Sequence, residues 1–179
     1  MSVQWFIGDT HYGHNGISQK FRTHFVSDEE HNETIHQNIM GVSGKRDTLF
    51  ILGDICFKTD QFWRIEEYSK NFEKVFLCGG NHDHASLFRY ASQFDNVYTF
   101  GIIKKFSFWL SHAPVHPQEL YRGMNVHGHV HSNTVPDARY YNVSCENINY
   151  QPVSLQHIRS VFEDRVNQGL IVPFEKHKD

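Results

Sequence analysis

The sequence predicts an α/β fold, which we describe as a four-layer α/β/β/α sandwich of two mixed β-sheets flanked by helices. Short apolar runs, typical of buried strands, alternate with helical patterns in the first half of the chain. From Val97 onward the rhythm changes to short β-like runs with tight links, which indicates a second sheet. The length of 179 residues and the lack of any linker or repeat favour one domain over residues 1–179.

In the first half, each predicted strand is followed by a helical pattern. Strands are expected at residues 3–7, 48–52 and 74–78. The stretch from Ser27 to Glu30 is a capping box that opens the first helix. Further helices are expected after Asp60 and over residues 83–93.

The second half begins with a meander or mixed sheet and closes with a helix. Its strands are expected at residues 97–100, 102–105, 106–110, 123–127 and 139–144. The closing helix is expected from Ser154 to Val166, because an apolar stripe recurs there at helical spacing.

Composition and charge exclude several classes of protein. The net charge is −3 and no dense Lys/Arg run occurs, so the broad electrostatic footprint of a duplex-binding protein is missing. No stretch is long and apolar enough to span a membrane, and the N-terminus lacks a signal-like segment, so we expect a cytoplasmic protein. The cysteines Cys56, Cys78 and Cys145 have no Cys-x-x-Cys spacing, which argues against disulfides and a thiolate zinc site.

Polar side chains follow five of the predicted strands at the point where each strand ends. The sequences are Asp9-Thr10-His11, Gly53-Asp54, Gly80-Asn81-His82-Asp83, His112 and Gly128-His129-Val130-His131. In α/β sheets ligands gather beyond the carboxyl ends of strands, so one place in the fold would collect all five sets. Helix capping alone would not produce this repetition. The pattern therefore predicts a metal site rich in histidine, the commonest metal-ligating side chain.

This series resembles the five motifs of the calcineurin-like metallophosphoesterase family, in the family's order, over residues 9 to 131. The resemblance implies two divalent metal ions that share Asp54. It implies one ion held by Asp9, His11 and His131, and a second held by Asn81, His112 and His129. Nitrogen and oxygen ligands suit manganese, which we favour, and also iron, zinc or nickel.

The resemblance also implies a mechanism. A metal-bridging hydroxide would attack phosphorus in line, and His82 would protonate the leaving oxygen or stabilise the phosphoryl oxygens. Asp83 would orient the His82 ring. With only Asp9 and Asp54 as carboxylates, two divalent ions leave a positive site that attracts a phosphate. His14, Asn81 and His82 are expected to contact the substrate.

We expect hydrolysis of phosphodiesters of small or nucleotide type. A phosphomonoesterase and a nuclease acting on strand ends are the alternatives within enzymes, so the expected partner is a phosphoester, including a nucleotide or a nucleic-acid end, and not a membrane. An inactive metal-bound interaction scaffold is the alternative of another class. A closed structural zinc site fits poorly, because seven ligands without cysteine exceed its usual four. Nothing in the sequence indicates the oligomeric state.

Overall fold

The computed structural model describes residues 2–121 and 123–171, and its first sheet is mixed. The strand order is β4-β3-β2-β1-β9. The strands are β1 (Gln4–Ile7), β2 (Thr48–Leu52), β3 (Lys74–Cys78), β4 (Val97–Phe100) and β9 (Val153–Ser154). The first four run parallel to one another, and β9 pairs antiparallel with β1. The three strands predicted in the first half therefore lie side by side at the centre of this sheet.

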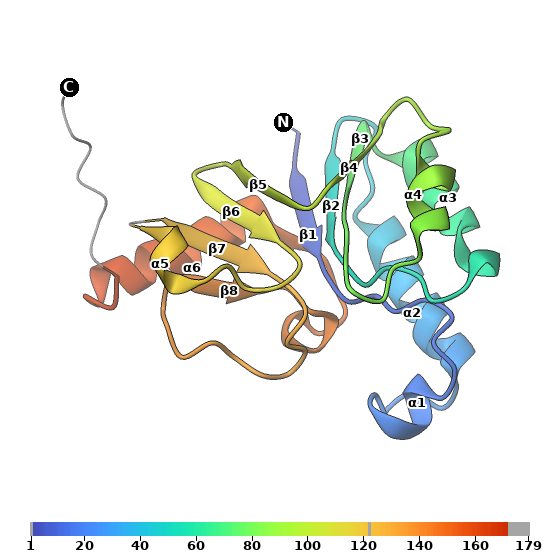
Figure 1. Cartoon of the computed structure of the whole chain (residues 1–179), viewed down its shortest axis with the longest axis horizontal. Helices are drawn as coiled ribbons and strands as arrows, with labels where there is room; N and C mark the ends of the chain where they lie inside the picture. Colours follow the sequence, from blue (N-terminus) through green and yellow to red (C-terminus); the bar gives the residue numbers. More distant parts are fainter. Residues whose placement is uncertain (1, 122, 172–179) are drawn as a thin grey trace.

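The second sheet is also mixed and has the order β5-β6-β7-β8. Its strands are β5 (Ile102–Lys105), β6 (Phe108–Ser111), β7 (Met124–His127) and β8 (Tyr140–Asn142). The pair β5–β6 is antiparallel, whereas β6–β7 and β7–β8 are parallel. Figure 1 shows this sheet beside the first one.

Helices cover the two sheets from outside. They are α1 (Ile17–Lys20), α2 (Asp28–Gly41), α3 (Trp63–Asn71), α4 (Ala85–Ala91), α5 (Pro117–Leu120) and α6 (Leu155–Asn167), with short 3₁₀ turns η1 (Thr59–Gln61) and η2 (Cys145–Ile148). In Figure 1, α2, α3 and α4 lie on the side of the first sheet, and α6 runs behind the second. The layered α/β prediction is confirmed.

Aromatic side chains form the core between the sheets. Phe50 of β2 lies between two other phenyl rings of the first sheet, with centroids 4.8 Å from Phe6 and 4.7 Å from Phe76. Phe106, in the turn after β5, meets Phe6 and Phe50 edge-on at 6.2 Å and 5.7 Å. Stacked and T-shaped pairs of this kind stabilise a fold by more than the burial of their apolar surface alone. They join the second sheet to the first.

The prediction that residues 97–100 belong to the second sheet is wrong. The strand exists, but it pairs parallel with β3, with Val97 opposite Val75. A strand, a helix and a parallel strand form a β3–α4–β4 unit, in which the helix returns the chain to the same sheet. Helix α4 also begins later than expected, at Ala85, because the His84 side chain accepts a hydrogen bond from the Ser86 amide and caps it.

Helix starts that carry a serine agree with the sequence. Ser27 Oγ accepts a hydrogen bond from the Glu30 amide at 3.0 Å, which opens α2 as the capping box predicts. Ser154 Oγ accepts from the His157 amide at 3.1 Å and opens α6. Within the described residues, the helices are all too short or too polar to cross a lipid bilayer.

Candidate metal centre

The predicted ligands converge at the carboxyl ends of strands from both sheets. Two pairs, Asp9 with His11 and His129 with His131, follow β1 and β7. Asp54, Asn81 and His112 follow β2, β3 and β6 one by one. Backbone hydrogen bonds continue beyond β1 and β2 and hold the first two loops in register, since the Asp9 amide donates to Gly53 O at 3.0 Å and the His11 amide donates to Asp54 O at 2.8 Å. The loops that bear the ligands are therefore extensions of the sheet.

The side chains form two groups. The ligand atoms of Asp9, His11 and His131 lie within 4.8 Å of one another, and so do those of Asp54, His112 and His129. Asn81 adjoins the second group, because its Oδ1 lies 2.9 Å from His112 Nε2. This division is the same as the one that the family resemblance implies.

Asp54 lies between the two groups. Its Oδ2 is 3.6 Å from Nε2 of His11, in the first group, and 3.4 Å from Nε2 of His112, in the second. The carboxylate is almost fully buried. A carboxylate that reaches both groups occupies the position that a ligand shared between two ions requires.

The chemistry of His11 fits a metal ligand. Both of its ring nitrogens are buried and neither has a hydrogen-bond partner. A buried polar atom without a partner is costly, and a bound cation would satisfy it. Burial, helped by the nearby Arg22 charge, lowers the pKa of His11 to about 2. The ring is therefore neutral, which is the form that binds a metal.

Contacts behind two of the histidines determine which ring nitrogen faces the centre. His112 Nδ1 donates to the Leu52 carbonyl at 2.9 Å. His131 Nδ1 donates to Glu146 Oε1 at 3.1 Å. Each bond uses Nδ1, so Nε2 is the ring nitrogen that remains to bind an ion, and it fixes the plane of the ring, as in the carboxylate–histidine–metal arrangements of other metalloproteins.

Glu146 and Arg22 support the first group, and sequence reasoning missed both. The Arg22 side chain is 1% exposed, and its Nε donates to Glu146 Oε1 at 2.9 Å. Its Nη2 donates to the Asp9 carbonyl at 2.7 Å, and its Nη1 lies 2.6 Å from His31 Nε2. Burial by itself would raise the pKa of Glu146, but the His131 bond and the Arg22 charge lower it to about 2. No local pattern in the sequence indicates this pairing.

Five ligands adopt a left-handed backbone conformation. The φ angles are 56° at Asp9, 49° at His11, 50° at Asp54, 74° at His129 and 52° at His131. This region is uncommon for residues other than glycine and costs of order 1–3 kcal/mol at each position. Strain of this kind clusters at functional sites, where the surrounding structure maintains it.

Glycines permit the close approach of the ligand loops. A Cβ at Gly128 would lie 2.5 Å from Asp9 Oδ2 and 2.9 Å from the Leu52 carbonyl. A Cβ at Gly53 would collide with the His112 ring, and one at Gly80 would collide with Asp54. A glycine is therefore required in each of these three motifs for steric reasons.

His82 lies at the edge of the centre. Its amide donates to Asp54 Oδ1 at 2.9 Å, which ties the loop to the central carboxylate. Its exposed ring stacks on Phe57, with centroids 5.0 Å apart, and lies 5.8 Å from the His11 ring. The imidazole is thus free to meet a substrate.

Asp83 has a different role from the one expected. Its Oδ1 accepts hydrogen bonds from the amides of Ile55 at 2.7 Å and Cys56 at 3.2 Å, and its Oδ2 accepts from the Gly80 amide at 3.0 Å. Among the described residues, no hydrogen bond joins Asp83 to the His82 ring. Asp83 fastens the loop after β3 to the loop after β2, so the prediction that it orients the His82 ring directly is wrong.

A hollow of about 600 Å³ opens beside the first ligand group. Its lining includes His11, His131 and His82, together with aromatic side chains of the loops around them. His14 is part of this lining, with its ring 4.5 Å from Phe57 and 6.1 Å from His11. This location suits the expected substrate contact, which remains a prediction.

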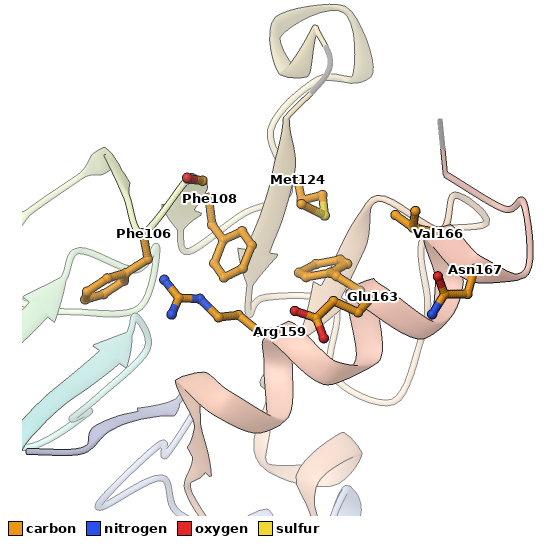
Figure 2. A pocket seen from close by; sticks show the side chains of 9 residues that line it. Phe106, Phe108, Met124, Arg159, Glu163, Val166 and Asn167 are labelled. Atoms are coloured by element: carbon orange, nitrogen blue, oxygen red, sulfur yellow. The ribbon is translucent and has the colours of Figure 1, made fainter. Parts of the chain in front are cut away.

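A second hollow, of about 500 Å³, lies between the second sheet and α6 (Figure 2). Phe108 and Met124 face it from the sheet, and Arg159 and Glu163 face it from the helix. None of the predicted ligands lines it. Of the two hollows, the first is therefore the one in contact with predicted ligands, through His11 and His131.

Comparisons with known proteins agree with this geometry. The family model described as calcineurin-like phosphoesterase matches residues 4–172. An uncharacterized protein of Methanocaldococcus jannaschii, MJ1445, is 31% identical over 169 residues, which are 89% of this chain and 90% of that protein. The crystal structure of a protein of unknown function from Aquifex aeolicus, AQ665, has a TM-score of 0.68 and 28% sequence identity, and the match covers 90% of this chain and 100% of that one.

The family match extends over nearly the whole chain, and the structure gathers the expected ligands into two groups around one carboxylate. The chain belongs to the calcineurin-like phosphoesterase family and has the two ligand groups of a dinuclear divalent metal site.

Proposed function

We propose that this protein hydrolyses phosphodiesters of small or nucleotide type, with two divalent ions, preferably manganese, in the two ligand groups. The observation that carries the proposal is the position of Asp54 between the groups, with the His82 loop bonded to its other oxygen. A phosphate at this centre would meet the His82 ring directly.

The metal ions, when bound, would supply an acidified water as nucleophile and positive charge for the phosphoryl oxygens. Asp9 and Asp54 are the only carboxylates in the two ligand groups, and the remaining ligands are neutral. The ligand set therefore leaves a net positive charge that favours an anionic substrate and the charge that develops in the transition state.

His82 would donate a proton to the leaving oxygen or a hydrogen bond to the phosphoryl oxygens. Its ring is held by stacking on Phe57, and its backbone is held by Asp54. Asp83 contributes indirectly, because it fixes the loop on which His82 lies. A general acid in such a position typically contributes about 10²–10⁴-fold to the rate.

The surroundings support a diester over a monoester. Among the residues that line the hollow, Arg22 is the only lysine or arginine, and its guanidinium is already bonded to Glu146 and the Asp9 carbonyl. A phosphomonoester dianion carries more charge than a diester and would find no free side-chain cation there for its second charge, so we expect it to bind at the metal ions as a product-like ligand and to be the poorer substrate. A phosphomonoesterase or strand-end nuclease is the second candidate. The observation that favours it is the exposed position of the His82 ring, which a larger substrate could also reach.

The test is hydrolysis of bis(p-nitrophenyl) phosphate and of p-nitrophenyl phosphate by protein loaded with Mn²⁺, each compared with EDTA-treated protein. We expect the diester to be the better substrate. His82→Asn should retain both metal ions by elemental analysis and lose about 10²–10⁴-fold in kcat. His157→Asn, on the exposed face of α6, is the control and should remain fully active. Full activity of His82→Asn would refute its role, and inactivity of the wild type toward both esters would favour the interaction scaffold.

A further inference from the structure

The hollow beside the first ligand group has aromatic walls. Phe21, Phe57 and Tyr150 line it together with the imidazoles of His14 and His24, and we call it the aromatic hollow. Its floor includes His11 and His131, which belong to the first ligand group. A phosphoester bound at the metal centre would therefore extend one of its organic groups into this space.

Its rings are available to a ligand. Phe21 follows α1, which projects at one end of the molecule in Figure 1, and its side chain is 72% exposed. Its ring meets His14 edge-on at 5.9 Å. Tyr150 and Phe57 are half-buried, so each still presents part of its ring. Three such rings around one hollow form a larger apolar surface than a single exposed phenyl, which would need no explanation.

The charges that line the aromatic hollow disfavour a second anionic group of the ligand there. Arg22 is the only lysine or arginine among its lining residues, and each of its three guanidinium nitrogens already has a partner. Glu146, also in the lining, adds a negative charge. An uncharged group is favoured here over a further phosphate or a carboxylate.

The size also suits a planar ring system. The volume of about 600 Å³ lies within the range of about 300–1,000 Å³ that is usual for pockets of small organic ligands. Aromatic side chains recognise nucleobases by stacking, without regard to the identity of the base.

We propose that the aromatic hollow binds a planar, uncharged aromatic group of the substrate, of the nucleobase type, while the phosphate lies at the two ligand groups. This inference rests on the proposed function and narrows its substrate class to nucleotide-like or aryl esters. Phe21 is the residue on which the specificity depends most, because it is more exposed than Phe57 and Tyr150.

The experiment compares two ligands that differ only in the base. Adenosine 5′-monophosphate and ribose 5-phosphate are titrated by calorimetry into the protein of residues 1–179 loaded with Mn²⁺. We expect adenosine 5′-monophosphate to bind about tenfold more tightly, in line with the usual contribution of one stacked base. Phe21→Ala should reduce this preference several-fold and leave the affinity for ribose 5-phosphate unchanged. Phe21→Trp should retain the preference.

Tyr121→Ala is the matched control, because Tyr121 is 79% exposed but lies outside the aromatic hollow. Equal affinities for the two ligands in the wild type, or failure of either to bind, would overturn the proposal. So would a preference that survives both Phe21→Ala and Tyr150→Leu. If the protein prefers the ligand with the base but hydrolyses no ester, only the proposed function is refuted. If it hydrolyses esters but shows no preference for the base, only the proposed role of the aromatic hollow is refuted.

Discussion

His131 depends for its orientation on a carboxylate that lies 15 residues later in the chain. Glu146 accepts a hydrogen bond from its Nδ1, and Arg22 holds Glu146 while it also bonds the carbonyl of Asp9. One buried arginine thus connects two of the three residues in the first ligand group. Among the described residues, the second group has no carboxylate of this kind, and His112 is oriented by the Leu52 carbonyl instead.

Glu146→Gln should weaken metal binding at the first group more than at the second. Glutamine keeps the size of the side chain but removes the negative charge that makes His131 a stronger metal ligand. Loss of such an outer contact typically costs about 10–100-fold in metal affinity. Calorimetric titration of the metal-free Glu146→Gln protein with Mn²⁺ would show one site with weakened affinity and one site with an affinity close to that of the wild type. Glu163→Gln, on the exposed side of α6, should change neither site, and equal weakening of both by Glu146→Gln would contradict the assignment.

Gly128→Ala should disrupt the centre for a purely steric reason. Its φ is not in the left-handed region, but a Cβ would lie 2.5 Å from Asp9 Oδ2. Overpacking of this kind typically costs about 1–3 kcal/mol, and here the displaced atom belongs to a predicted metal ligand. Chemical denaturation and metal analysis would check both effects. Gly41→Ala, at the end of α2 with no atom within 4 Å of the added carbon, should leave stability unchanged or increase it slightly.

At the scale of the elements, the sequence was informative where a pattern is local. Residues 48–52 and 74–78 are strands within the predicted limits, because a short apolar run between turn residues has few other structures available. The sheet to which residues 97–100 belong depends on pairing with β3, and no property of those four residues reveals it. The partner of Asp83 was missed for the same reason, since its hydrogen bonds reach 27 and 28 residues back to Cys56 and Ile55.

The candidate site shows the same contrast. The ligands could be predicted because each lies in a short motif at the end of a strand. Glu146 and Arg22 could not, because they are 124 residues apart and neither lies in such a motif. Phe21 was also missed, because its importance comes from the hollow that it lines. Contacts that join distant segments become visible only in the folded chain.

Asp28, the first residue of α2, holds the segment that carries Phe21 and Arg22. Its carboxylate accepts hydrogen bonds from the Gly16 amide at 2.6 Å and from the Ser18 amide and hydroxyl at 3.0 Å and 2.6 Å. The bonds to Ser18 lower the pKa of Asp28 to about 2, from an ordinary value of 3.8. A lowered pKa in the folded state means that the ionised carboxylate stabilises the fold above the unfolded value and that this stabilisation is lost as the pH falls.

Asp28→Asn should therefore destabilise the protein in a pH-dependent way. Because Asp28 is only partly buried and solvent screens its charge, we expect only about 1 kcal/mol at pH 7. Urea denaturation of both proteins should show the difference undiminished above about pH 5 and shrinking as the pH falls from about 4 toward 2. A difference that stays constant over this range would show that the charge of Asp28 has no part in it.

At the scale of the whole molecule, both ligand groups draw on both sheets. Asp9 and His11 follow β1 of the first sheet, and His131 follows β7 of the second. Asp54 follows β2 of the first sheet, whereas His112 and His129 follow strands of the second. The sheets already meet near the centre, where the Gly8 amide donates to the Val143 carbonyl at 2.8 Å. Each metal ion would therefore act as a cross-link between the two sheets.

Metal removal should accordingly lower the stability of the whole fold, because ligands from both sheets separate when the chain unfolds. An ion present at about 100 times its dissociation constant adds about 2.7 kcal/mol to the free energy of unfolding. For a chain of this size that corresponds to about 5–10 °C in Tm for each site. Calorimetry should show one transition that shifts upward with Mn²⁺ and downward with EDTA. His131→Ala should abolish about half of the shift, because the second group stays complete. The ions would not hold the two sheets together if EDTA left the Tm unchanged. The same would follow if the transition separated into two, with one sheet unfolding at a lower temperature than the other.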